Sequence, residues 1–158
     1  MEDQELVRLA LGARERAYAP YSKFQVGAAL LTGTGRVYQG CNIECASYTP
    51  TNCAERTAFF KAVSEGARLC CHRDCRRTHA APVKQACPPC GVCRQVMREF
   101  CDPSSFRVIL ASGPDNWVSY RLEELLPLGF GPENLNRGKE ARAVRMYDIL
   151  AKKRDGGI

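Results

Sequence analysis

The sequence has 158 residues, of which 45% are hydrophobic and 25% are charged, as expected for a single globular domain. No apolar run approaches the roughly 20 residues that a membrane-spanning helix needs. The acidic start at residues 1–5 lacks the basic and apolar segments of a secretory signal. These features exclude a membrane protein and predict a cytoplasmic one.

The net charge of +6 is concentrated in residues 68–84 and 137–154. Neither stretch interleaves basic residues with regularly placed aromatic residues, as grooves for single-stranded nucleic acid do. Basic patches alone are ambiguous, and a solvated surface explains most of this charge. We therefore do not expect a dedicated nucleic-acid site.

The chain contains ten cysteines. In a small secreted domain this number would predict a disulfide framework. Without an export signal, metal ligation together with spare thiols in a reducing compartment explains the cysteines better.

Hydrophobic periodicity predicts a first helix over residues 3–17, where apolar side chains recur at helical spacing. Residues 24–31 are typical of a buried strand. A glycine-containing turn at 33–35 joins it to a second strand at 36–43, which predicts a hairpin. The next helix begins near residue 51 or 52 and runs to Ser64, before a glycine.

The second half of the chain predicts a helix from Pro89 to Phe100, with the proline at the first helical position, where its missing N–H costs nothing. Residues 106–111 predict a core strand, residues 117–120 a weaker strand, and residues 122–126 a short helical turn. Residues 139–152 predict a further helix with apolar residues on one side.

Helices interspersed among strands predict a three-layer α/β domain. We assign residues 1–136 to this domain and residues 137–158 to a basic C-terminal helical tail. Residues 66–87 show neither alternation nor an apolar run. We expect them to be a loop or a poorly formed strand, that is, an atypical insert or a degenerate strand.

Two short motifs, TNCAER from Thr51 and PPCGVCRQ from Pro88, each place a cysteine at the start of a predicted helix. Both helix dipoles would then direct their positive ends at thiolates. Cys90 and Cys93 share a helix face, and Cys53 supplies a third sulfur if the two helix starts lie side by side. Three thiolates leave the fourth position of Zn²⁺ open, as in catalytic sites. The motifs therefore predict one Zn²⁺ per chain.

Glu55 follows Cys53 by two residues, so it would lie near the metal without needing to bind it. In that place it could take a proton from water and deliver protons to ring N3 and to leaving ammonia. A glutamate of this kind, followed by P-C-x-x-C, is the pattern of zinc deaminases. Arg56 could withdraw some of the charge of the thiolates. A C-x-x-C alone also occurs in structural zinc half-sites and redox pairs, so the interpretation depends on both motifs together.

The chain resembles homotetrameric-type cytidine deaminases over roughly residues 3–65 and 87–135. Several separate motifs in the same order make this resemblance more specific than either zinc motif alone. They are YAPYSKF from Tyr18, GCNIE from Gly40, CAERTA from Cys53, PCGVCRQV from Pro89 and LLPLGF from Leu125. The resemblance implies a three-layer α/β/α cytidine deaminase-like fold with a mixed sheet, assembled as a homotetramer.

The resemblance also implies an activity. It is the zinc-dependent hydrolytic deamination of cytidine and 2′-deoxycytidine to uridine and 2′-deoxyuridine, as in pyrimidine salvage, with a small-molecule nucleoside as substrate. Two alternatives stay open. One is a deaminase of another cytosine compound, such as a nucleoside antibiotic or a polynucleotide. The other is a non-catalytic zinc-binding relative.

Substrate contacts follow from the same resemblance. Phe24 would lie against the pyrimidine ring, and Asn42 and Glu44 would bind the ribose hydroxyl. The Ala54 backbone would read the base, and Phe130 would close the pocket of a neighbouring subunit. An aromatic face suits a flat base, and a carboxylate accepts from a sugar hydroxyl. On pattern alone, Phe24 could instead belong to the core.

The chain departs from the family pattern in two regions. Cys45 stands where the family usually has a further asparagine, and Cys41 and Cys45 flank the sugar-binding pair with oxidisable thiols. Residues 66–87 occupy the place of an apolar central strand, whose loss would remove core packing. Local divergence could explain that segment. A second metal site could instead offset the loss, with candidate ligands Cys70, Cys71, His72, Cys75, His79 and Cys87.

Overall fold

The computed structural model describes residues 1–67, 69, 76–80 and 87–135, with residues 76–80 described by their backbone. The strands are β1 (Gly27–Leu31), β2 (Val37–Cys41), β3 (Arg76–Ala80), β4 (Arg107–Gly113) and β5 (Asn116–Arg121). The helices are α1 (Asp3–Arg14), α2 (Ala54–Ser64), α3 (Gly91–Phe100), α4 (Leu122–Leu125) and the short 3₁₀ helix η1 (Pro132–Leu135). The predicted tail helix over 139–152 lies outside the described residues.

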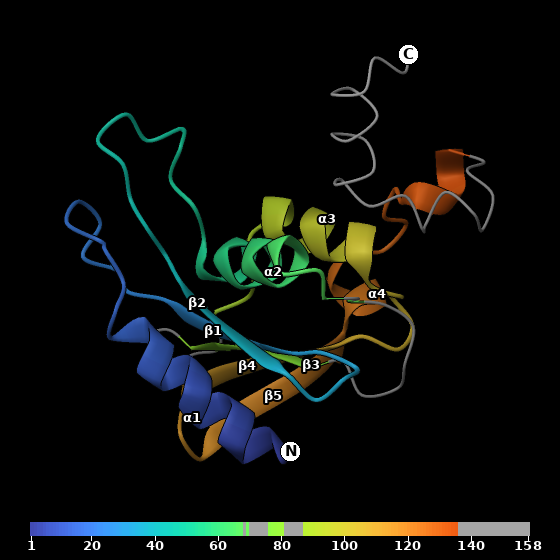
Figure 1. Cartoon of the computed structure of the whole chain (residues 1–158), viewed down its shortest axis with the longest axis horizontal. Coiled ribbons are helices and arrows are strands. Elements are labelled where there is room, and N and C mark those ends of the chain that lie inside the picture. The colour runs from blue at the N-terminus through green and yellow to red at the C-terminus, as the bar shows by residue number, and fades with distance from the viewer. Residues whose placement is uncertain (68, 70–75, 81–86, 136–158) are drawn as a thin grey trace.

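Within these residues the strands form one sheet in the order β2-β1-β3-β4-β5. Helix α1 covers one face of the sheet, and α2 and α3 lie side by side over the other (Figure 1). The predicted three-layer α/β/α architecture is therefore confirmed. None of the described helices combines the length and apolar character needed to cross a membrane.

Strand β1 is buried along its whole length because helices cover both faces of the sheet. Ala28 and Leu30 pack into the cluster beneath α2 and α3, whereas Ala29 and Leu31 pack into the cluster beneath α1. Successive strand residues point to opposite faces, so a strand covered on both sides needs a continuous apolar run. This requirement explains why a continuous apolar run in the sequence indicates an inner strand.

Strand β3 lies at the centre of the sheet, antiparallel to β1 and parallel to β4, which makes the sheet mixed. The sequence left a loop or a poorly formed strand open for this segment, and the backbone of residues 76–80 forms a strand. Backbone pairing on both sides satisfies the N–H and C=O groups of the strand whatever its side-chain pattern. The missing apolar pattern therefore did not prevent a central strand.

Helix α3 begins at Gly91, the residue after the first cysteine of the C-x-x-C motif. That cysteine, Cys90, is the N-cap of the helix. The prediction that Pro89 occupies the first helical position is therefore wrong. Cys90 has an extended backbone, with φ −64° and ψ 164°, so it lies outside the helix and Pro89 precedes the cap. Helix α1 likewise ends at Arg14, three residues before the predicted end at residue 17.

Candidate metal centre and substrate cleft

The start of α2 is held against strand β2 by a close approach at Gly40. A Cβ at this position would lie 2.3 Å from the carbonyl oxygen of Ala54 and 2.5 Å from the backbone nitrogen of Ala58. Both distances are far below van der Waals contact, so any side chain at Gly40 would push α2 away from the sheet. This contact fixes the height of Cys53 and Glu55 above the sheet.

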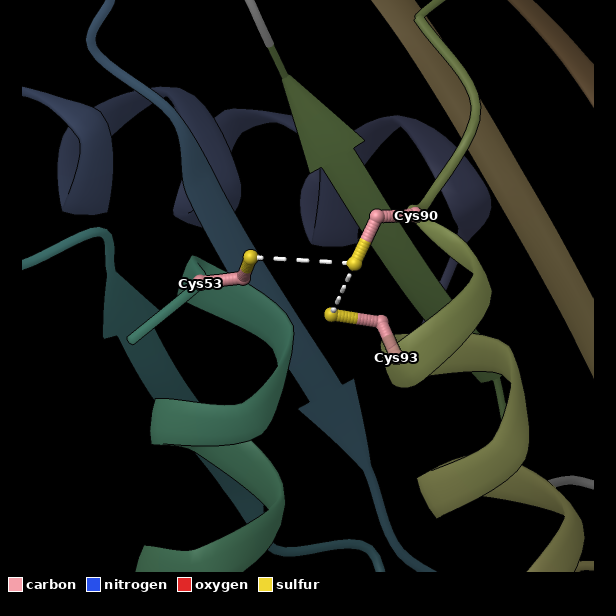
Figure 2. A group of neighbouring side chains, drawn as sticks. All are labelled: Cys53, Cys90 and Cys93. Atoms are coloured by element: carbon pink, nitrogen blue, oxygen red, sulfur yellow. Dashed lines mark hydrogen bonds between the residues drawn. The ribbon is translucent and has the colours of Figure 1, made fainter. Parts of the chain in front are cut away.

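Cys53 and Cys90 are the N-cap residues of α2 and α3, as the sequence predicted for cysteines at two helix starts. Neither side chain makes a capping hydrogen bond, which distinguishes both from the Ser, Thr, Asp or Asn residues usual at this position. Cys93 lies in the first turn of α3, on the same side as Cys90 (Figure 2). Both helix N-termini therefore present sulfur atoms to one point.

The three sulfur atoms lie within 4.8 Å of one another, and we call Cys53, Cys90 and Cys93 the metal centre. Sγ of Cys90 is 3.9 Å from Sγ of Cys53 and 3.4 Å from Sγ of Cys93, as the dashed lines in Figure 2 mark. Tetrahedral zinc with Zn–S bonds of about 2.3 Å separates its sulfur ligands by roughly 3.8 Å. The donor atoms and their spacing therefore fit one zinc ion with a fourth position left for another ligand.

Glu55 lies beside the metal centre without belonging to it. Glu55 is only 2% exposed, and its Oε2 accepts from Sγ of Cys93 at 3.6 Å. A buried carboxylate next to sulfur ligands is costly unless a cation or a proton compensates it. The position therefore suits a group that exchanges protons next to a metal.

Arg56 and the thiols together set the charge of the metal centre. The Arg56 guanidinium donates to Sγ of Cys53 at 3.7 Å and to the carbonyl of Thr51 at 3.1 Å. A hydrogen bond from Cys93, together with Arg56, lowers the pKa of Cys53 to about 6, although burial opposes the change. The same hydrogen bond and burial raise the pKa of Cys93. Of Cys53 and Cys93, Cys53 is therefore the thiol that ionises first.

Among the ligands considered for a second metal, Cys87 is the one whose side chain the structure describes. Cys87 is a half-buried free thiol outside the metal centre. Cys70, Cys71, His72 and Cys75 lie outside the described residues, and His79 is described by its backbone alone. The second site therefore stays a prediction.

The predicted substrate residues Phe24, Asn42 and Glu44 come together in two adjoining loops, which Figure 1 shows on one side of the molecule before β1 and after β2. We call residues 21–26 and 42–44 the loop network. Asn42, buried, accepts the N–H of Val26 at 2.8 Å and donates to the carbonyl of Phe24 at 2.9 Å. Phe24 is partly buried against the cluster that also contains Cys93. The aromatic ring thus packs on the side of the sheet that carries the metal centre.

Glu44 lines a cleft of about 380 Å³ together with residues that the sequence did not assign. These lining residues are Tyr21, Ser22, Tyr48 and Thr51. The ring centroids of Tyr21 and Tyr48 lie 6.1 Å apart, with the ring planes tilted by 54°. Tyr48 has φ 59°, a conformation rare for non-glycine residues and often found at functional sites.

One of these residues, Ser22, has a local signal in the sequence that motif reading missed, and Thr51 supports the neighbouring loop. Ser22 Oγ accepts the N–H of Phe24, two residues later, which is the spacing of a serine turn. Thr51 Oγ1 accepts the N–H of Cys45 at 3.0 Å, so Cys45 stays tied to the loop despite its departure from the family pattern. Cys41 donates through sulfur to the carbonyl of Arg16.

Of the two remaining predicted substrate residues, Ala54 is buried and Phe130 is exposed. Ala54 is fully buried as the first residue of α2, directly above Gly40. Phe130 is 57% exposed and is held through its carbonyl, which accepts from Nε2 of Gln95 at 2.8 Å. The ring of Phe130 is not among the residues that line the described cleft. Its role at a neighbouring subunit stays a prediction.

Comparison with known proteins gives one consistent result. Residues 1–109 match the family described as cytidine and deoxycytidylate deaminase zinc-binding region. The chain is 49% identical over 136 residues to a cytidine deaminase of Halalkalibacterium halodurans, covering 86% of this chain and 99% of the relative. It is 46% identical over 140 residues to one of Sporosarcina psychrophila, covering 89% and 99%. The crystal structure of a cytidine deaminase from Burkholderia pseudomallei superimposes with a TM-score of 0.76 and 42% identity, covering 82% of this chain and all of that one.

Proposed function

The chain belongs to the cytidine and deoxycytidylate deaminase family, and from this premise we propose that it deaminates cytidine and 2′-deoxycytidine hydrolytically. The products are uridine or 2′-deoxyuridine and ammonia, as in pyrimidine salvage. The observation that carries the proposal is the metal centre with a buried carboxylate beside it. Three sulfurs within 4.8 Å and Glu55 Oε2 at 3.6 Å from Cys93 combine a metal site with a proton carrier.

A zinc ion held by Cys53, Cys90 and Cys93 supplies the Lewis acidity that makes water nucleophilic near neutral pH. Glu55 accepts a proton from the attacking water and passes protons to N3 of the ring and to the departing amino group. The oxygen of water becomes the C4 carbonyl oxygen. One of its protons ends on N3 and the other leaves with ammonia, so the atoms balance.

Arg56 offsets part of the negative charge that three sulfur ligands bring to the centre. Its guanidinium lies 3.7 Å from Sγ of Cys53, close enough for a charge-assisted contact. Three thiolates donate more charge than three imidazoles and would acidify water less. The cation at Arg56 and the two helix N-termini counteract that tendency.

The loop network binds the nucleoside in this proposal. The ring of Phe24 lies against the base and the backbone of Ala54 reads it, while Asn42 and Glu44 hydrogen-bond to the sugar. The exposed ring of Phe130 completes the pocket of a neighbouring copy, so that the active form is a homotetramer. Six of the described cysteines, Cys41, Cys45, Cys53, Cys87, Cys90 and Cys93, are not in disulfides, which favours a reducing compartment and therefore the cytoplasm.

The test is a cytidine assay on the purified full-length protein, followed by loss of ultraviolet absorbance, beside a zinc count per chain. We expect turnover of cytidine and 2′-deoxycytidine with about one zinc per chain, since one catalytic site needs one ion. A cytosine-containing oligonucleotide serves as the control substrate and should not react. Turnover of the oligonucleotide alone would contradict the nucleoside assignment, and a zinc-loaded, folded protein without turnover would contradict the enzyme.

A further inference from the structure

Ser22 lies between the two residues that the proposed function assigns to the base and the sugar. Its hydroxyl donates to Oε1 of Glu44 and accepts the N–H of Phe24 at 3.0 Å. Its backbone N–H donates to Oε2 of Glu44 at 3.2 Å. One short side chain therefore connects the carboxylate of Glu44 directly to the backbone of Phe24.

The carboxylate of Glu44 uses most of its acceptor positions for hydrogen bonds within the loop network. It accepts the hydroxyl of Ser22, the N–H of Ser22 and the N–H of Tyr21 at 3.0 Å. A carboxylate has about four acceptor positions, so about one is left for a substrate hydroxyl. The hydrogen bond from Ser22 lowers the pKa of Glu44, which keeps it a carboxylate. Glu44 therefore makes more hydrogen bonds within its own loops than it can make to a sugar.

The backbone between Ser22 and Phe24 needs such support. Lys23, the residue between them, has φ 57°, a left-handed conformation that non-glycine residues rarely adopt. Conformations of this kind persist where surrounding contacts hold them in place. Ser22 supplies the contacts on one side, and Asn42, through the carbonyl of Phe24 and the N–H of Val26, supplies them on the other.

We propose that Ser22 is a positioning residue, which ties Phe24 to Glu44 so that the groups facing the base and the sugar are held as one unit. The inference rests on the proposed function, because it takes Phe24 and Glu44 as substrate contacts. Loss of the Ser22 hydroxyl removes the link between the two groups and weakens nucleoside binding, while Glu44 keeps its backbone N–H contacts and the metal centre and Glu55 stay as they are.

The experiment compares Ser22→Ala and Ser22→Thr in the zinc-loaded full-length protein. Ser22→Ala should raise KM for cytidine by about tenfold or more, the size of a lost hydrogen bond to a charged group, with kcat within about twofold. Ser22→Thr keeps the hydroxyl and should restore KM. Ser64→Ala is the matched control, because its hydroxyl also makes one hydrogen bond, at 2.8 Å to the carbonyl of Lys61, at the exposed end of α2.

A double variant tests whether Ser22 acts through Glu44. In the Glu44→Gln background, Ser22→Ala should add little to KM, because the partner of its hydroxyl has already changed. Effects on KM that multiply fully would overturn the proposal. So would a Ser22→Ala protein whose melting temperature falls while KM is unchanged, since that result identifies a purely structural serine.

Calorimetric binding of cytidine separates this inference from the proposed function. If the wild type binds cytidine without turning it over, the proposed deamination fails. The role of Ser22 is then tested by the affinity for cytidine alone. About tenfold weaker binding by Ser22→Ala supports the inference, and binding equal to that of the wild type overturns it. A wild-type protein that does not bind cytidine would overturn both.

Discussion

The metal centre and the loop network place their functional groups by different kinds of contact. In the metal centre, two helix starts bring three sulfurs within 4.8 Å, and each sulfur belongs to the N-cap or the first turn of a helix. In the loop network, segments about twenty residues apart in sequence are joined by hydrogen bonds between the side chains of Asn42 and Glu44 and the backbone of residues 21–26.

This difference in contacts determines how each region responds to a substitution. A tetrahedral ion tolerates little change in ligand distance, so loss of one sulfur or a shift of one helix removes the whole site. The loop network distributes its support over several hydrogen bonds, each of modest net worth, so one loss weakens the arrangement without abolishing it. We therefore expect all-or-none effects at the metal centre and graded effects in the loops.

Replacing one sulfur ligand should have the largest effect. Cys90→Ser should lose both bound zinc and turnover of cytidine, because the exposed Cys90 bridges the other two sulfurs. Metal analysis of the purified variant and the absorbance assay measure the two losses. Cys87→Ser is the matched control, three residues earlier and outside the metal centre, and should keep both. Zinc that survives in Cys90→Ser but not in Cys87→Ser would contradict the ligand set.

Glu55→Gln should separate metal binding from chemistry. The amide has the size of the carboxyl group but cannot carry the proton, so kcat should fall by about 10²–10⁴-fold, the usual contribution of a general acid or base. The zinc content should stay at the wild-type value, because Glu55 lies beside the ligands and not among them. An active variant would remove Glu55 from the proposed mechanism.

Gly40→Ala tests whether the height of α2 above the sheet sets the metal centre. The new Cβ would lie 2.3 Å from the carbonyl oxygen of Ala54, so we expect a loss of roughly 1–3 kcal/mol in the free energy of unfolding, as for other overpacked sites. Zinc affinity should fall with it, because Cys53 moves with the helix. Urea unfolding and zinc titration measure the two effects.

Gly12→Ala is the control for that experiment. A Cβ on Gly12, inside α1, meets nothing within 4 Å, so the alanine should stabilise the helix by about 0.5–1 kcal/mol. If Gly40→Ala were as stable as Gly12→Ala, the close approach of α2 to β2 would not govern the site.

The metal centre could be predicted from the sequence because its determinants are local. Cysteine spacing and helix starts are readable from a few neighbouring residues, and the sulfurs of Cys53, Cys90 and Cys93 do come together. The misplaced Pro89 shows the limit of that reading. The pattern shows that a helix begins, but the extended backbone of Cys90 decides at which residue.

The loop network and strand β3 could be predicted only in part, because their determinants are long-range. Nothing near Ser22 in the sequence shows that its hydroxyl meets Glu44, more than twenty residues away. The left-handed backbone of Lys23 has no glycine to mark it. Strand β3 is held by pairing with β1 and β4, which a search for apolar alternation cannot detect.

The smallest expected effect is a pH dependence in the loop network. The hydrogen bond from Ser22 lowers the pKa of Glu44 below its ordinary value of 4.5, and the charge of Lys23 acts in the same direction. A carboxyl group with a lowered folded pKa contributes stability above its unfolded pKa and loses it as pH falls through the folded pKa. The wild type should therefore be slightly more stable than Ser22→Ala at neutral pH. That advantage should shrink once pH falls below 4.5.

Urea unfolding of both proteins over a pH series measures this difference, at low salt because Glu44 is near the surface and its interactions are screened. The offset between Ser64→Ala and the wild type should stay constant over the same range, since the hydroxyl of Ser64 donates to the carbonyl of Lys61, a group that does not titrate. A wild-type advantage over Ser22→Ala that is equally constant would mean that the Ser22 hydroxyl does not act on the carboxylate. Glu44 would then depend on the backbone N–H groups of Tyr21 and Ser22 alone, and the Ser22 side chain would not connect Glu44 to Phe24.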